Sequence, residues 1–458
     1  MLGGNVTVTL GLLLFCYTRR DKMEFWSPPL FLAAIYVYYV ILGPLLSVLS
    51  GATYDRLIDM REFYASGWTG ALVGLVSWVI GYIARGGRRD PRPPMPSVMP
   101  TDRLRKIGIG LNVSGMTAFL ITAGISAIWL INPLAGADEP TGSGGYSGAF
   151  ANYLALAVNL LIPGCLLLFL LWLRGGGGLW IVGLWTAVAM GIYTSLGFRY
   201  RLVLLAAGFS FIYYIERKTR PNLLLLAGVA TTFIAVMGFI GNHREYGRGL
   251  RIEESQTSFA ESLSVGFGET GIFATSGAVI DHVPEATPHA LFAPLVQTVL
   301  MPVPSALFPG KATNGYLLEA IMTIYGPKNY EGAAYMLFGE WYLAFGWAGV
   351  ILVYGLLGWA CRFLWEWFSV RQSDPMAVVV YGASLPFIYV IMSRGYLPGV
   401  TMMFFYTVFP TIALYRWNRS QMPQQPRGVP GLRMPPRFPG RRPPGPRPLR
   451  GPARGPAR

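Results

Sequence analysis

Long apolar runs restrict the fold of this chain more than any other sequence feature. Of its 458 residues, 53% are hydrophobic and 13% are charged. The hydrophobic residues collect in stretches close to the roughly 20 residues that a helix needs to cross a bilayer, a composition that excludes a cytosolic globular enzyme. The sequence predicts an all-α, polytopic integral membrane protein with about eleven transmembrane helices, near residues 2–17, 29–50, 67–84, 107–131, 149–173, 179–197, 201–215, 221–241, 346–365, 376–392 and 398–415.

The distribution of Lys and Arg predicts the orientation, because short basic loops stay on the cytoplasmic side of a membrane. With an external N-terminus and a cytoplasmic C-terminus, the predicted cytoplasmic segments hold 27 of the 37 basic residues and 7 of the 22 acidic residues. These segments are residues 18–28, 85–106, 174–178, 216–220, 362–375 and the C-terminal residues from 416 on.

Loop lengths divide the chain further. Residues 1–241 and 346–416 hold the predicted membrane helices, and residues 242–345 form one large external loop, whose length is typical of a functional segment. Within this loop, residues 289–301 are apolar but too short to span, so we expect a helix on the outer leaflet. A second membrane-associated stretch is expected at residues 333–345.

The last part, residues 417–458, is a tail with ten arginines, twelve prolines and no acidic residue. Without the tail the net charge falls from +15 to +5. Such a segment has no apolar period and cannot build a packed element. It could bind anionic lipid headgroups or an acidic partner, or it could be a solvated tail that only fixes the topology.

The motifs of several common chemistries are missing from the sequence. It contains no GxxxxGK[ST], HExxH or CxxC motif and no GxGxxG on a strand and helix pair, which disfavours ATP-driven transport and metal-dependent hydrolysis. Asp55 and Asp59 could bind a divalent cation, but the interleaved Arg56 and Arg61 favour a solvated loop. We therefore predict neither a metal site nor a cofactor.

Cations at the external membrane boundary are the strongest candidates for a functional site. Charges close to the membrane are costly unless they are paired or face a wet cavity, and guanidinium groups bind phosphate oxygens through two parallel hydrogen bonds. The alternative for each cation is an interfacial anchor or an ion pair with an external acid. The cations beside predicted helix ends are Arg199, Arg244, Lys311 and Arg394, with Arg201, Arg248 and Arg251 in the same segments.

Two further side chains could move or hold a proton. Glu340 lies in an otherwise apolar helical stretch close to the bilayer, where it could act as a general base or orient a hydroxyl group. Its alternative role is to pair with an arginine. His243, His282 and His289 all lie in the predicted external loop, and His243 directly precedes Arg244.

Residues 180–410 resemble the Wzy-type O-antigen and oligosaccharide repeat-unit polymerases of bacterial envelopes. The resemblance rests on an ordered series of short motifs and on the topology. One departure is visible, since Val303 and Pro304 stand where the family often has an arginine after the first proline. The motifs are the Gly-Phe-Arg turn at 197–199, ERKTR at 216–220, an arginine after the next helix, PVPSALFPGK at 302–311, FGEWYLAFGWAG at 338–349 and SRG at 393–395.

The resemblance implies a class C glycosyltransferase-like fold in a bacterial plasma membrane. It further implies metal-independent transfer of a polyprenyl-diphosphate-linked oligosaccharide to the terminal sugar hydroxyl of another lipid-linked repeat unit, on the external face. Arg199, Arg244, Lys311 and Arg394 would then bind the diphosphate, and Glu340 or His243 would activate the acceptor. Expected partners are these lipid-linked oligosaccharides, membrane lipids and a chain-length regulator protein, but no nucleic acid.

Two alternatives stay open at this point. An O-antigen ligase-like transferase would share the topology and the cations but use a different acceptor. A non-enzymatic flippase for lipid-linked oligosaccharides would instead hold its charges in a central cavity and have short loops throughout, unlike residues 242–345.

Overall fold

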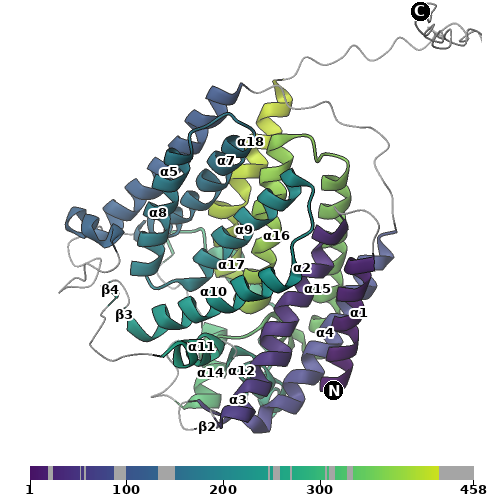
Figure 1. The fold of residues 1–458 in the computed structure, drawn as a ribbon. Helices are drawn as coiled ribbons and strands as arrows, with labels where there is room; N and C mark the ends of the chain where they lie inside the picture. Colours follow the sequence, from purple (N-terminus) through teal and green to yellow (C-terminus); the bar gives the residue numbers. More distant parts are fainter. Residues whose placement is uncertain are drawn as a thin grey trace, which may run out of the picture.

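The computed structural model describes most of the chain as α-helix (Figure 1). Two pairs of two-residue strands are the sheet structure found among the described residues: β1 (Tyr54–Asp55) pairs with β2 (Ile58–Asp59), and β3 (Arg244–Glu245) pairs with β4 (Gly249–Leu250). The prediction of an all-helical fold is therefore confirmed. The structure describes residues 1–18, 24–51, 53–55, 58–86, 100–132, 150–245, 248–250, 258–268, 271–304, 307–308, 315–326 and 334–421.

The helices in the first half of the chain are α1 (Leu2–Thr18), α2 (Pro28–Tyr36), α3 (Gly43–Ser50), α4 (Tyr64–Ala84), α5 (Thr101–Ala123), α6 (Ala151–Ala157), α7 (Leu161–Leu173), α8 (Leu179–Ser195) and α9 (Arg199–Arg217). Those in the second half are α10 (Leu223–His243), α11 (Phe259–Gly268), α12 (Gly271–His282), α13 (Ala293–Leu300), α14 (Gly315–Tyr325), α15 (Leu337–Ser369), α16 (Pro375–Ser393), α17 (Leu397–Thr407) and α18 (Phe409–Ser420). Short 3₁₀ or π turns link some of them: η1 (Glu24–Trp26), η2 (Val37–Leu42), η3 (Met60–Phe63), η4 (Ile125–Ile131) and η5 (Val158–Leu160).

Eight helical segments of the described chain are long and apolar enough to cross a membrane, as a multi-pass membrane protein requires. Seven of them overlap predicted spans, and the predicted span at 398–415 is the pair α17 and α18, bent by 43°. α1 and α8 are apolar but shorter, and α9 is not among these candidates. The total of eleven crossings stays a prediction. The eight segments are Pro28–Ser50, Met60–Ala84, Thr101–Ala123, Ala151–Leu173, Leu224–His243, Phe259–His282, Leu337–Ser369 and Pro375–Ser393.

One of these segments falls where the sequence predicts a single external loop. Helices α11 and α12 together form Phe259–His282, which passes the length and hydropathy test for a span. α12 packs against both α4 and α15, because Gly277 lets it approach the backbone at Phe63 and Gly67. The loop assignment missed this segment because its mean hydropathy of 1.2 is the lowest of the eight.

The two apolar stretches predicted within residues 242–345 are helical. Residues 293–300 form α13, which packs against α17, and residues 337–345 form the first turns of α15. Non-helical dihedral angles at Phe345 and Gly346 bend α15, and Gly346 has a φ of 60° that glycine adopts without steric cost. The bend separates Leu337–Ala344 from the long helix that follows.

The predicted cytoplasmic segments meet at one end of the bundle. Arg85, after α4, pairs with Glu366 near the end of α15 at 3.0 Å, and Arg174, after α7, pairs with Glu216 near the end of α9 at 2.7 Å. In Figure 1 the N-terminus lies at the opposite end of the molecule from α18. The grouping agrees with the predicted topology, and the side of the membrane that this end faces stays a prediction.

Glycines allow a close helix contact between α4 and α15. A Cβ atom on Gly74 would overlap the ring of Tyr354, and one on Gly81 would overlap the carbonyl oxygen of Gly355. A Cβ atom on Gly358 would likewise overlap the carbonyl oxygen of Trp78. Small residues are what lets two membrane helices touch through their backbones.

Replacing Gly81 by alanine should therefore force α4 and α15 apart. We expect a loss of about 1–3 kcal/mol in the free energy of unfolding, because overpacking moves the backbone, and a lower unfolding temperature in detergent. Gly110→Ala in α5 is the matched control, since nothing lies within 4 Å of its new Cβ atom and alanine favours a helix. Equal unfolding temperatures for both variants would contradict the glycine contact.

Candidate functional site

The candidate site begins at the N-terminus of α9, which follows a tight turn at Gly197 (φ 77°). Phe198 occupies the N-cap position and supplies no side-chain hydrogen bond to the helix. The first turn of a helix leaves backbone N–H groups without intrahelical partners, and the helix dipole is positive there. The N-terminus of a long helix without a side-chain cap is a favourable place for an anion when cationic side chains lie beside it.

Arg201, in this first turn, is a buried cation enclosed by aromatic rings. Its side chain is only 3% exposed, and its Cζ lies 4.6 Å from the ring centroid of Phe198, 5.5 Å from Tyr193 and 5.7 Å from Tyr200. Its Nε donates to the hydroxyl of Tyr200 at 3.3 Å.

Among the described residues, no acidic side chain pairs with Arg201. Its Nη1 has no hydrogen-bond acceptor within the described part of the chain. Cation–π contacts offset a part of the cost of burying a guanidinium group, but a buried charge without an ion pair or acceptor is expensive. Arg201 is therefore arranged to receive an anion or another acceptor.

Arg394 reaches the same aromatic ring from another helix. It follows the last turn of α16, is half-buried, and its Cζ lies 5.9 Å from the ring centroid of Tyr200. α9 and α16 pack closely because Gly208 and Gly382 face each other's helix. The structure thus brings two arginines, distant in the sequence, to one tyrosine.

Glu340 lies in the short segment before the bend of α15 and is 1% exposed. Its Oε1 accepts two hydrogen bonds, from the hydroxyl of Tyr316 in α14 at 2.6 Å and from the backbone N–H of Leu397 at 2.7 Å. Both of these hydrogen bonds reach the same oxygen, Oε1. Neither donor is an arginine, so the structure does not support the alternative of a structural ion pair.

A short loop connects Glu340 with Arg394. The N–H of Gly395 donates to the carbonyl oxygen of Tyr335 at 2.8 Å, and a Cβ atom on Gly395 would stand 2.7 Å from the carbonyl oxygen of Met336 and 3.2 Å from Cβ of Glu340. Only a glycine allows this approach. Because residues 394–397 lie against the start of α15, Arg394 and Glu340 belong to one local structure.

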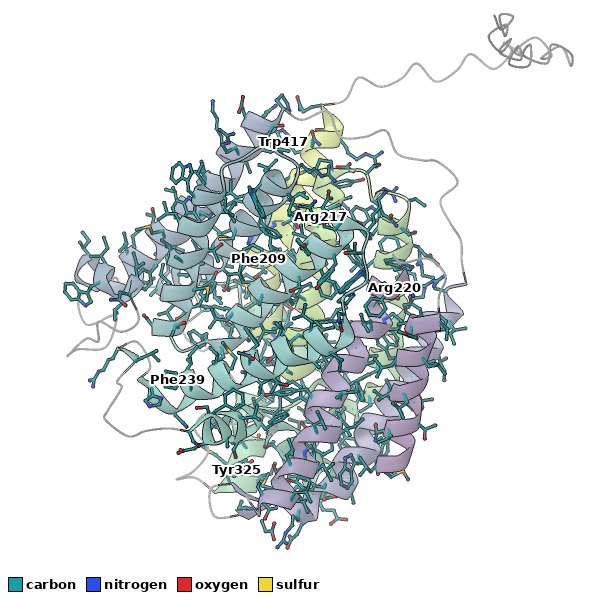
Figure 2. The ribbon with its side chains drawn as sticks, in the orientation of Figure 1. Phe209, Arg217, Arg220, Phe239, Tyr325 and Trp417 are labelled. Carbon is teal, nitrogen blue, oxygen red and sulfur yellow. The ribbon has the colours of Figure 1, made fainter. Side chains whose placement is uncertain are left out.

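The other predicted residues lie at the end of α10. Arg199 donates from Nη1 to the carbonyl oxygen of Met237 at 3.2 Å and contacts Gly241. His243 is buried, its Nδ1 bonds to the carbonyl oxygen of Phe239 at 2.9 Å, and the two rings lie 4.3 Å apart. Figure 2 shows Phe239 at this end of α10, near the strands.

For two of the predicted cations, Arg244 and Lys311, the structure describes no side-chain contacts. The backbone of Arg244 begins β3, which packs with β4 against α8. The side chain of Arg244 and the whole of Lys311 lie outside the described residues. Their predicted contacts with a diphosphate stay predictions.

The sequence did not identify the aromatic part of the site. Tyr200 stands between two arginines in GFRYR, an alternation that could have indicated cations held by a ring. Tyr193 and Tyr316 carry no such signal, because a tyrosine in an apolar helix is usually a packing residue. Their roles depend on contacts between α8, α9, α14 and α15.

Of the two aspartates in the first predicted external loop, Asp59 binds the neighbouring Arg61. Both oxygens of Asp59 accept from Nε of Arg61, at 3.0 and 2.9 Å, and Arg61 holds the pKa of Asp59 below its ordinary value. The side chain of Asp55 is not described. No group of three or more His, Cys, Asp or Glu side chains gathers into a potential metal site in the described part of the chain.

Comparison with known proteins adds no relative. The chain matches no protein-family model, no curated protein and no solved structure. The function must therefore be argued from the geometry of the site and from the motifs.

The hydrogen bond from Tyr316 to Glu340 should contribute to the free energy of unfolding. Burial and the neighbouring carboxylate raise the pKa of Tyr316 well above its ordinary value, so its hydroxyl remains a donor at any physiological pH. Tyr316→Phe should lower the free energy of unfolding by about 1–3 kcal/mol, because one donor of a buried carboxylate is lost.

A double-mutant cycle with Glu340→Leu isolates this contact. The two substitutions should be non-additive, measured as unfolding temperatures of the single and double variants. Tyr213→Phe is the control, since its ring is 41% exposed. Additive effects would show that Tyr316 and Glu340 act independently.

Proposed function

We propose that this protein is a membrane glycan polymerase that transfers a polyprenyl-diphosphate-linked oligosaccharide to a sugar hydroxyl of another lipid-linked repeat unit. The observation that carries the proposal is the buried Arg201, which has an unfilled donor beside Arg394 and the uncapped N-terminus of α9. The order of motifs between residues 180 and 410 supports the same reaction.

The leaving group of this reaction is a diphosphate. As the bond between the anomeric carbon and the diphosphate oxygen breaks, the electron pair stays on that oxygen and negative charge develops there. Arg201 and Arg394 would stabilise this charge through fixed guanidinium groups in an apolar surrounding, where electrostatic stabilisation is strong. Arg199 would hold the end of α10 beside this site, and Arg244 and Lys311 would supply further positive charge.

The acceptor needs a base, because its hydroxyl oxygen forms the new bond to the anomeric carbon and loses its proton. Glu340 would accept this proton at Oε2, the oxygen that neither Tyr316 nor Leu397 contacts, while these two donors hold Oε1 in place. Since Glu340 is 1% exposed, the acceptor reaches it only after α14 or residues 394–397 shift. His243 is bound to its own helix and is the weaker candidate for the base.

The reaction can be tested with purified protein and a polyprenyl-diphosphate-linked repeat unit as the sole substrate. We expect longer lipid-linked glycans and an equal amount of released polyprenyl diphosphate, without added metal or nucleotide. Arg201→Gln should lower the rate by about 100-fold or more, as removal of a transition-state donor does, and Arg201→Lys should restore part of it.

Two controls separate this result from other causes. Arg217→Gln removes an exposed charge at the far end of α9 (Figure 2) and should leave the rate unchanged. Transfer that appears only after a different acceptor is added would instead identify a ligase. Movement of the lipid-linked unit across vesicles without elongation would identify a flippase, and full activity of folded Arg201→Gln and Arg394→Gln proteins would refute the proposed site.

A further inference from the structure

The end of the bundle opposite the N-terminus collects exposed cations. Five contacts show that these helix ends lie together: Arg85–Glu366, Arg174–Glu216, Arg105 with the carbonyl oxygen of Gly176, Arg174 with that of Ser373, and Arg103 with the ring of Trp417. We refer to this region as the basic end. It is remote from the proposed reaction, and the inference below does not depend on it.

The acidic side chains of the basic end are mostly turned inward. Glu366 is buried between Arg85, at 3.0 Å, and Arg362, at 2.8 Å. Glu216 binds Arg174 through both oxygens. Asp374 is 1% exposed and caps α16 by accepting from the N–H of Met376 at 2.9 Å. Glu366 and Glu216 are thus engaged by Arg85, Arg362 and Arg174, and Asp374 is engaged as a helix cap, so these acids do not compensate the outer cations.

The uncompensated cations gather where the start of α5 meets the end of α18. Arg103 and Lys106, one turn apart, are exposed on α5, and Arg416 is exposed on α18. None of the three has an acidic partner within the described chain. Asp102 is the one exposed acid described on these two helix ends. We call Arg103, Lys106, Arg416 and Trp417 the α5–α18 corner.

Trp417 gives this corner the character of a membrane interface. Its ring is 40% exposed, and the guanidinium group of Arg103 lies 4.3 Å from its centroid. Tryptophan prefers the level of lipid headgroups, and arginine binds phosphate oxygens in pairs. A cation held flat on an exposed tryptophan is thus placed to meet a headgroup phosphate while the ring meets the acyl boundary.

We propose that the α5–α18 corner binds the headgroup of an anionic phospholipid. The occupant is not the part of the chain that follows α18, because residues 421–458 contain nine arginines and no acidic residue and would be repelled. Anionic lipids attract basic segments at a membrane surface with an energy that adds for each Lys or Arg and is screened by salt.

The test compares phosphatidylglycerol with phosphatidylcholine on the full-length protein. Delipidated protein in neutral detergent is titrated with each lipid, and the bound lipid is counted by native mass spectrometry. We expect preferential retention of phosphatidylglycerol. The variant Arg103→Gln/Lys106→Gln/Arg416→Gln should lose affinity by about fivefold for each removed charge.

Two further measurements keep the proposal falsifiable. Arg103→Lys/Arg416→Lys preserves the charge and should keep most of the preference, which separates electrostatic binding from misfolding. The preference should also fall in 0.5 M salt, a concentration that screens surface charges. Equal retention of both lipids by the wild type, or equal preference in the triple variant, would overturn the proposal. Stronger competition by soluble polyglutamate than by phosphatidylglycerol would overturn it in favour of an acidic protein partner.

Discussion

The backbone contact between α4 and α15 is the constraint on which the rest of the structure depends. Gly81 and Gly358 allow the two helices to touch, and this contact fixes the long part of α15. The bend at Phe345 and Gly346 then sets the direction of the preceding segment, which carries Glu340. Residues 394–397 lie on that segment and aim Arg394 at Tyr200, so the candidate site is assembled from helices that are far apart in the sequence.

Charged side chains have different partners at the basic end and at the candidate site. At the basic end, acids such as Glu366 and Glu216 form short ion pairs with neighbouring arginines. At the candidate site, Arg201 is enclosed by aromatic rings and Glu340 by neutral donors. A cation and an acid that are both buried, and not paired with each other, store interaction energy that a substrate can use. This contrast is the main physical reason to propose a reaction at the candidate site and lipid binding at the basic end.

Much of the helical architecture could be predicted, because apolar runs of about 20 residues have few other uses. The sequence did not predict Phe259–His282 as a candidate span, since Glu261, Glu269 and Asp281 interrupt its apolar pattern. The sequence singled out Glu340 and Arg394 but did not predict that the loop after α16, which carries Arg394, lies against Glu340 in α15. It also favoured Arg199, whereas Arg201 is the buried cation.

The sequence by itself determined the helical membrane architecture, the concentration of positive charge at predicted loop ends and the residues able to bind an anion. Only the tertiary structure decided which of them face the same place. Arg199 and Arg201 are two residues apart, so they point to different sides of α9, one toward α10 and one into a ring of Phe198, Tyr193 and Tyr200. Which side becomes buried depends on the packing of α8, α10 and α16, which local sequence does not encode.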